Sequence, residues 1–206
     1  MLVRELSVAG ALEMTPVQHD DDRGTFLEWF REDELTKAAG HSLHLAQANC
    51  SVSRSGTLRG IHFAELPPGQ AKFVTCAHGA ALDVVVDLRL GSPSFGRWDA
   101  VTLDDEDRRA VYLPEGVGHA FLALADQTVV NYLCSAPYAP GREHAVHPLD
   151  PAIGIEWPTT ARDGSALTPL LSPKDDAAPS LAEVRARGVL ASYEACLAFS
   201  RGELAP

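Results

Sequence analysis

Short β-rich segments, separated by glycine, proline and aspartate turns, run through most of this 206-residue chain and limit its possible folds more than any other feature. The chain carries such segments at 71–76, 80–89, 98–103, 110–113, 119–124 and 128–135, whereas helical patterns are confined to 32–40 and 180–200. The β-branched run at 80–89 predicts a strand buried on both faces. This pattern predicts an all-β fold: a jelly-roll, cupin-like β-barrel with short C-terminal helices.

The domain organisation follows from the absence of any repeat, low-complexity tract or boundary before residue 160. We therefore expect a single domain over 1–206, with a barrel core at about 1–160 and a loop and helical extension at about 161–206. The proline-rich stretch 136–158 is expected to be irregular.

Charge and cysteine usage exclude several classes of protein. The formal net charge of -11 argues against a nucleic-acid or anionic-membrane partner, but it permits a small phosphate-bearing ligand held by a few basic side chains. The start lacks a signal-like apolar run, and no segment reaches membrane-spanning length. Four scattered cysteines without a C-x-x-C pair predict buried free thiols in a reducing cytoplasm.

A possible binding stretch is Leu58-Arg59-Gly60-Ile61-His62. In a regular strand, Arg59 and His62 would point to opposite faces, because side chains alternate. Gly60 can bend or bulge the backbone and bring the two side chains together. If they converge, the two side chains line a binding cavity. The alternative is that Arg59 lies on the surface and His62 is a core histidine.

Further polar residues interrupt strands that should be apolar. Glu28 lies between two aromatic rings on one predicted face, and two amides share a face of the strand expected at 43–52. Such donors and acceptors need partners, whether protein, water or ligand. Lys72 opens the strand at 71–76, where it either reaches the same cavity or is an exposed edge lysine.

A metal site is the first alternative to consider in a jelly-roll barrel. Such sites commonly place two histidines at alternate strand positions and add a carboxylate. Position 64, two residues after His62, is Ala64, and no third ligand is visible beside His62 and His119. We therefore predict no metal.

Several motifs in register resemble the dTDP-4-dehydrorhamnose 3,5-epimerase family. They are 22–24 (DRG), 58–62 (LRGIH), 83–89 (DVVVDLR), 92–96 (SPSFG), 118–121 (GHAF) and the 150–158 ending. The match covers about residues 1–176. The resemblance implies a cofactor-free jelly-roll homodimer that acts on a dTDP-4-keto-6-deoxy sugar.

The same resemblance implies catalytic roles. His62 matches a general base that removes a hydrogen beside the C4 ketone, and Lys72 matches the cation that stabilises the enolate. Tyr132 matches the acid that returns a proton from the opposite face. Asp175 matches the carboxylate partner of the base, with Asp83 and Asp176 as alternatives.

The resemblance also implies binding roles. The matched diphosphate contacts are Arg23, Arg59 and His119. The matched nucleotide contacts are Phe26, Glu28, Gln47, Asn49, Tyr138, which would stack on thymine, and Glu143. Some of these residues are expected from the neighbouring subunit.

Departures from the family pattern leave open which deoxysugar is the substrate. Phe63, Tyr112 and Leu133 replace residues that are frequent in the family near the sugar end of the site. These changes resemble the branch that serves deoxysugars of secondary metabolites, such as antibiotics, where epimerisation occurs at C3, at C5 or at both. Two other hypotheses remain: a metal-dependent cupin oxygenase or isomerase, and a non-catalytic nucleotide-sugar-binding barrel.

Overall fold

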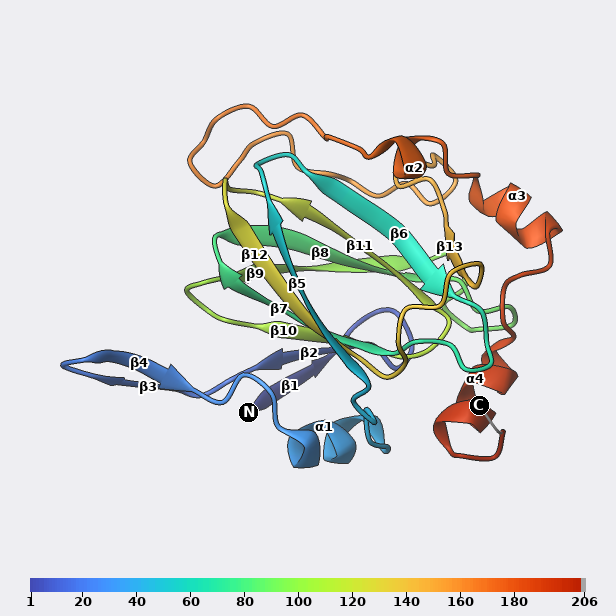
Figure 1. Cartoon of the computed structure of the whole chain (residues 1–206), viewed down its shortest axis with the longest axis horizontal. Helices are drawn as coiled ribbons and strands as arrows, with labels where there is room; N and C mark the ends of the chain where they lie inside the picture. Colours follow the sequence, from blue (N-terminus) through green and yellow to red (C-terminus); the bar gives the residue numbers. More distant parts are fainter. Residues whose placement is uncertain (205–206) are drawn as a thin grey trace.

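Two antiparallel sheets face each other in the computed structural model, which describes residues 1–204 (Figure 1). The first sheet has the order β1-β2-β10-β7-β12-β5. Its strands are β1 (Leu2–Glu5), β2 (Leu12–Thr15), β10 (Ala110–Leu113), β7 (Lys72–His78), β12 (Thr128–Cys134) and β5 (Gln47–Ser53). The second has the order β13-β6-β11-β8-β9. Its strands are β13 (Glu143–Ala145), β6 (Leu58–Ala64), β11 (Val117–Ala123), β8 (Ala80–Asp87) and β9 (Trp98–Asp104).

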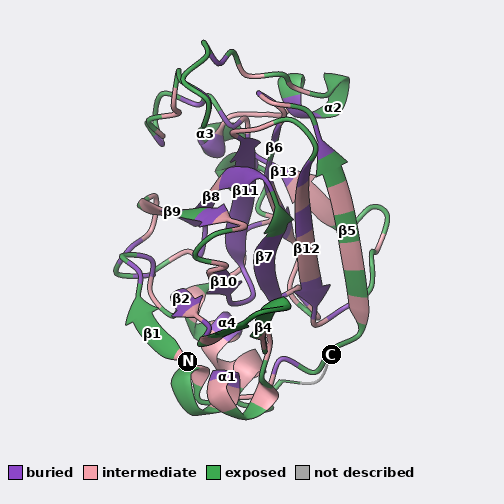
Figure 2. Ribbon diagram, turned by 90° about the vertical axis from the view of Figure 1, so that its left-hand side faces the viewer, coloured by how far each residue is buried: buried purple, intermediate pink, exposed green. Residues whose placement is uncertain are grey.

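The main core lies between these sheets. Val74 and Val130 of the first sheet belong to the same buried cluster as Val85 and Phe121 of the second. Figure 2 shows the central strands β7, β8, β11 and β12 largely buried, as their apolar sequences require.

Four short helices lie outside the barrel: α1 (Glu32–Ala39), α2 (Pro173–Asp176), α3 (Leu181–Ala186) and α4 (Tyr193–Ser200). Leu181 and Val184 of α3 pack on the outer face of the second sheet, while Leu35 of α1 packs on the first. None of the helices in the described part of the chain is long and apolar enough to cross a membrane.

A bulge in β6 brings two polar side chains to the same side of the strand. His119 of β11 pairs with His62 and Phe121 pairs with Arg59, so two steps along β11 correspond to three along β6. Gly60 permits this close approach, because a Cβ there would lie 2.5 Å from the Ala120 Cβ and the backbone φ is +121°. The predicted bend at Gly60 is confirmed.

A separate two-stranded hairpin projects from the barrel, formed by β3 (Gln18–Asp21) and β4 (Gly24–Leu27) (Figure 1). Its side chains are mostly exposed, and Phe26 is 67% exposed. An isolated two-stranded hairpin has little stability in water, and within residues 1–204 the strands of this one pair only with each other.

The predicted all-β fold with short C-terminal helices is confirmed, including the helix that ends at Gly40 and the break at Gly188. Three expectations were wrong: the strand expected over 43–52 begins at Gln47, the strand expected to carry Glu28 ends before it at Leu27, and 136–158, expected to be irregular, contains β13. Cys50 is exposed on the edge strand β5, whereas the other three cysteines are buried free thiols as predicted. The expected extension ends at 206, and 205–206 lie outside the described residues.

Candidate active site

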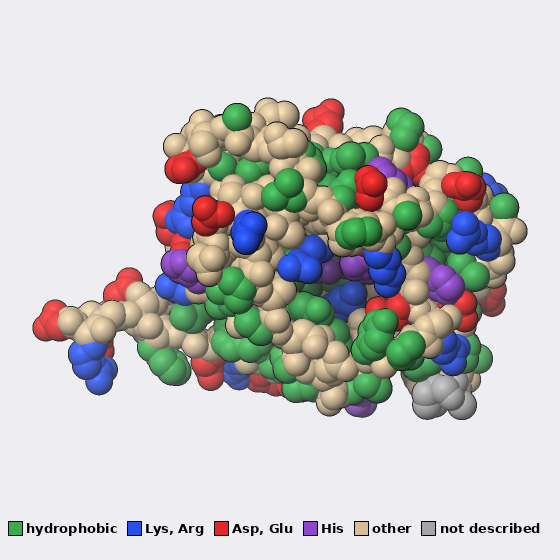
Figure 3. Space-filling model, turned by 45° about the horizontal axis from the view of Figure 1, so that its top comes forward, with side chains coloured by type: hydrophobic (Ala, Val, Ile, Leu, Met, Phe, Trp, Pro, Cys, Tyr) green, Lys and Arg blue, Asp and Glu red, His purple; other side chains and the backbone are tan. Residues whose placement is uncertain are grey.

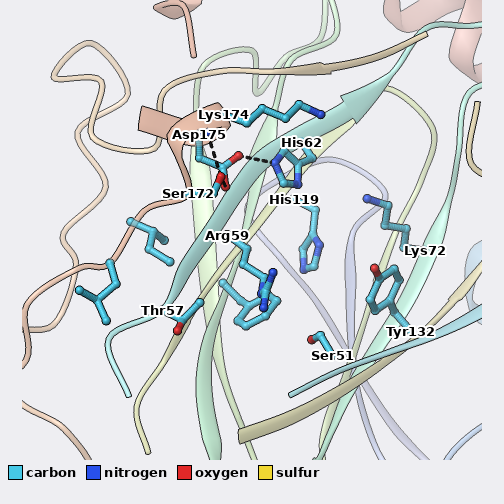
Figure 4. A pocket seen from close by; sticks show the side chains of 13 residues that line it. Ser51, Thr57, Arg59, His62, Lys72, His119, Tyr132, Ser172, Lys174 and Asp175 are labelled. Atoms are coloured by element: carbon cyan, nitrogen blue, oxygen red, sulfur yellow. Dashed lines mark hydrogen bonds and ion pairs between the residues drawn. The ribbon is translucent and has the colours of Figure 1, made fainter. Parts of the chain in front are cut away.

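A cavity of about 290 Å³ opens between the two sheets and is bordered by the C-terminal segment (Figure 4). Both sheets contribute to its walls. The lining residues are Ser51, Thr57, Leu58, Arg59, His62, Lys72, His119, Phe121, Tyr132, Leu170, Ser172, Lys174 and Asp175. Six of the predicted site residues, from five separate chain segments, therefore meet in one place.

His62 and Asp175 form a close pair on one wall of the cavity. The distance from His62 Nε2 to Asp175 Oδ1 is 2.6 Å, and the Asp175 side chain is only 5% exposed while His62 is 34% exposed. Burial opposes the charge on Asp175, but hydrogen bonds from His62 and Ser172 outweigh it and lower the Asp175 pKa. The contact fixes the ring tautomer: Nε2–H donates to the carboxylate, and Nδ1 on the other side of the ring can accept a proton (Figure 4).

The two alternative carboxylates lie elsewhere. Asp83 Oδ2 is 2.7 Å from His119 Nε2, which makes a second histidine–aspartate pair, and Asp176 is exposed. The carboxylate that contacts His62 is thus Asp175. Within residues 1–204 no group of three or more His, Cys, Asp and Glu side chains is arranged to hold a metal ion.

Lys72 and Tyr132 occupy the wall formed by the first sheet, on neighbouring strands β7 and β12 (Figure 4). Burial lowers the pKa of the Lys72 ammonium, an effect that Cys134 and two carboxylates oppose only in part. Burial likewise raises the pKa of the Tyr132 phenol, so its hydroxyl keeps its proton at neutral pH.

The cavity is cationic although the chain is acidic overall. Arg59, Lys72 and Lys174 all line it, together with two histidines, and Figure 3 shows Lys, Arg and His side chains gathered in a central hollow. The Arg59 Nε donates to the Ser53 hydroxyl at 3.3 Å. Such a basic hollow suits an anionic ligand such as a diphosphate.

Four other predicted contacts lie on nearby strands or loops but do not line this cavity. Gln47 and Asn49 project from the edge strand β5 and are joined by a 2.8 Å hydrogen bond. The Tyr138 amide donates to Gln47 Oε1, and the Tyr138 side chain is 56% exposed. Glu143 lies on β13, opposite Ala64 of β6.

Arg23, Phe26 and Glu28 are not near the cavity of their own chain. The first two belong to the projecting hairpin (Figure 1), and Arg23 pairs there with Asp21. Glu28 follows the hairpin and forms an exposed ion pair with Arg31 at 3.4 Å.

Several lining residues were not predicted, among them Ser51, Thr57, Ser172 and Lys174. One of them carried a sequence signal. Ser172 begins a Ser-x-x-Asp motif that predicts a helix N-cap, and its side chain does accept from the Asp175 amide. Of the others, Ser51 lies on β5, Thr57 directly precedes β6 and Lys174 is on α2, so their meeting at the cavity depends on how these distant segments pack.

The fold and the cavity define a class of protein. A β-barrel with a histidine–aspartate pair, a buried lysine and a tyrosine around one basic cavity has the residues of an enzyme that uses general acid–base catalysis on an anionic ligand. The family model for dTDP-4-dehydrorhamnose 3,5-epimerase matches residues 5–183.

Individual relatives agree with this match. The dTDP-4-dehydrorhamnose 3,5-epimerase of Mycolicibacterium smegmatis is 58% identical over 97% of this chain and 95% of the relative. The structure of the Mycobacterium tuberculosis rmlC epimerase is 53% identical, covers 100% of both chains and superposes with a TM-score of 0.93. ChmJ, a 3'-monoepimerase from Streptomyces bikiniensis solved with dTDP-quinovose, is 50% identical over 96% of both chains, with a TM-score of 0.88.

The chain therefore belongs to the dTDP-4-dehydrorhamnose 3,5-epimerase family. It has the cupin fold of its structural relatives, and its activity is epimerisation of a dTDP-4-keto-6-deoxyhexose, at C3 and C5 or at C3 alone.

Proposed function

We propose that His62 and Tyr132 exchange the proton at the epimerised carbon from opposite sides of the sugar ring. One observation carries this proposal: His62 is on β6 of the second sheet and Tyr132 is on β12 of the first, and both line the same cavity. A sugar ring held between the sheets would meet a base on one face and an acid on the other.

The proton transfers balance as follows. His62 Nδ1 takes the C–H proton beside the C4 ketone, the C–H electron pair becomes the enolate, and Asp175 stabilises the imidazolium. The Lys72 ammonium neutralises the charge on the C4 oxygen. The Tyr132 hydroxyl then protonates the same carbon from the opposite face, and solvent restores both side chains.

The basic side chains support the binding of a dTDP-sugar. Arg59 and His119 are proposed to hold the diphosphate, since a guanidinium donates two hydrogen bonds to phosphate oxygens. Gln47, Asn49 and Glu143 are proposed to contact the nucleoside, with the Tyr138 ring stacked on thymine. The relative from Legionella pneumophila was solved in complex with dTDP-4-keto-L-rhamnose, which supports this class of ligand.

The projecting hairpin supports a homodimer in which each subunit completes the other's site. Arg23, Phe26 and Glu28 would reach the partner's cavity, and Phe26 would lose its exposure there. Mixing the inactive chains R23A and H62N tests this. A dimer that exchanges hairpins regains about a quarter of wild-type activity by random pairing, because one of its two sites is intact. No recovery after subunit exchange contradicts the sharing of sites.

We further propose that 1–206 is one domain and that the protein is cytoplasmic. A single domain is supported by the C-terminal extension, which supplies Asp175 to the barrel cavity and packs α3 on the barrel. A cytoplasmic location is supported by the three buried free thiols, which suit a reducing compartment. Limited proteolysis that removed the chain beyond residue 160 and left activity would contradict the first point. Recovery of the protein outside the cytoplasmic fraction would contradict the second.

The experiment that tests the mechanism is incubation of dTDP-4-keto-6-deoxyglucose with the protein in D2O. We expect deuterium at C3, or at C3 and C5, and no incorporation with H62N. Mass spectrometry counts the deuterons and NMR gives their positions, so the same sample also reports which carbon is epimerised. Wild-type protein that binds the sugar without incorporation would refute the mechanism for this substrate.

A further inference from the structure

The carboxylate of Asp175 is held from two sides. Its Oδ1 contacts His62 Nε2 at 2.6 Å, and its Oδ2 accepts a hydrogen bond from the Ser172 hydroxyl at 2.8 Å. The same hydroxyl accepts from the Asp175 amide at 3.1 Å, as the N-cap of α2. Ser172 therefore contacts both the backbone and the side chain of Asp175, and it lines the cavity.

The segment that carries these residues is attached to the strand that carries His62. The Leu58 amide donates to the Leu170 carbonyl at 3.0 Å, and the Leu170 amide donates to the Gly56 carbonyl at 2.7 Å. Gly56 allows this close contact, because a Cβ there would lie 2.5 Å from the Thr168 carbonyl oxygen and its φ is +83°. Backbone docking thus sets the position of α2 relative to His62.

Backbone docking leaves the rotation of the Asp175 side chain free. A carboxylate on a four-residue helix has several rotamers, and only some of them direct Oδ1 at the imidazole. The Ser172 hydroxyl restricts this rotation, because it donates to the oxygen that does not contact His62.

We infer that Ser172 is a positioning residue of the epimerase: it orients Asp175, which orients the imidazole of His62, so that the three residues act as one hydrogen-bonded chain. This inference rests on the proposed role of His62 as the base. The other charged group near the Asp175 carboxylate is Lys174, which is exposed at the cavity and is not needed for the chain of hydrogen bonds.

The protein contains a matched control for this arrangement. Ser180 caps α3 in the same way: its side chain accepts from the Glu183 amide and donates to Glu183 Oε2 at 2.7 Å. Both serines are cap residues three positions before an acidic residue, but Glu183 does not contact a histidine. S180A removes the same cap chemistry without touching the site.

The test compares S172A, S172T and S180A by epimerisation kinetics, affinity for dTDP and thermal unfolding. We expect S172A to lower kcat about tenfold or more, since it removes a hydrogen bond to a charged group, while KM and the dTDP affinity change less than about twofold. The acid limb of its kcat–pH profile should move to higher pH, because the Ser172 hydrogen bond helps to lower the Asp175 pKa and its loss makes that carboxylate easier to protonate. S172T keeps the hydroxyl and should restore kcat, and S180A should have wild-type kinetics.

Three results would overturn the inference: S172A as active as S180A, S172T as impaired as S172A, or a loss confined to KM and dTDP affinity. These failures are distinct from failure of the mechanism itself. If wild-type protein exchanges no proton into the sugar, or if H62N remains active, the proposed role of His62 fails before Ser172 is considered.

Discussion

Replacing Lys72 by methionine should stabilise the fold and abolish most of the activity. The Lys72 side chain is only 9% exposed, and no carboxylate among residues 1–204 lies within ion-pair distance of it. Removal of an unpaired ammonium from water can cost several kcal/mol, but this group faces an open cavity, so we assign a cost of about 1–2 kcal/mol. Methionine has a similar length, no charge and adaptable packing.

For a domain of this size, the change corresponds to a rise in Tm of about 2–8 °C. The sign follows from the pKa. Burial lowers the pKa of Lys72 in the folded protein, so the unfolded chain binds more protons between the two pKa values, and the free energy of unfolding rises with pH across that window. K72M should flatten this part of the stability–pH curve.

The activity should fall about 10²–10³-fold in K72M, as when one oxyanion donor is removed. In wild type, activity should likewise fall as pH rises through the lowered pKa of Lys72, because the neutral amine no longer stabilises the enolate. The assays are thermal unfolding at several pH values and deuterium incorporation into the sugar. K37M, at an exposed helical position, is the control and should change stability by less than about 0.5 kcal/mol. The reasoning is refuted if K72M is less stable than wild type, or if it retains a third or more of the activity.

Two further predictions concern the bulge and the acid. G60A should lower the free energy of unfolding by about 2–6 kcal/mol, because the added Cβ overpacks against the neighbouring strand and the backbone is strained. G91A is the control: Gly91 also has a positive φ, but no atom lies within 4 Å of the added Cβ, so this variant should show only the strain. An equal loss of stability in both variants would show that the clash at Gly60 is relieved. Y132F should slow epimerisation by about 10²-fold or more while C–H exchange with solvent continues from the His62 side. An equal loss of exchange and epimerisation would contradict the assignment of Tyr132 as the acid.

Local sequence patterns were sufficient to predict much of the architecture. The strand at 80–89, the helix that ends at Gly40 and the break at Gly188 each follow from β-branching or from glycine conformation, which are properties of a few neighbouring residues. The edge strand β5 and the short strand β13 were harder to predict. Their boundaries depend on pairing with β12 and β6, which lie far away in the sequence.

The site was predictable as a set of residue types but not as an arrangement. Arg59-Gly60-Ile61-His62 indicated that two polar side chains could converge, because glycine can interrupt the alternation, but the stretch alone also allowed a surface arginine beside a core histidine. The family resemblance put Asp175 first as the partner of His62, but the residue types alone did not separate it from Asp83 and Asp176. Asp83 pairs instead with His119, and only the docking of 168–172 on β6 brings Asp175 to the imidazole.

The sequence alone determined that this chain is an all-β barrel of the epimerase family, because strand periodicity, turn residues and motifs in register are all local properties. The tertiary structure decided which carboxylate contacts His62 and that Lys72 is buried in the cavity wall. It also decided that the hairpin with Arg23 and Phe26 projects away from the cavity of its own chain. The reason is physical: hydrogen-bond partners and burial depend on the approach of segments that are distant in the sequence, such as those of His62 and Asp175, and this approach is set by packing of the whole barrel.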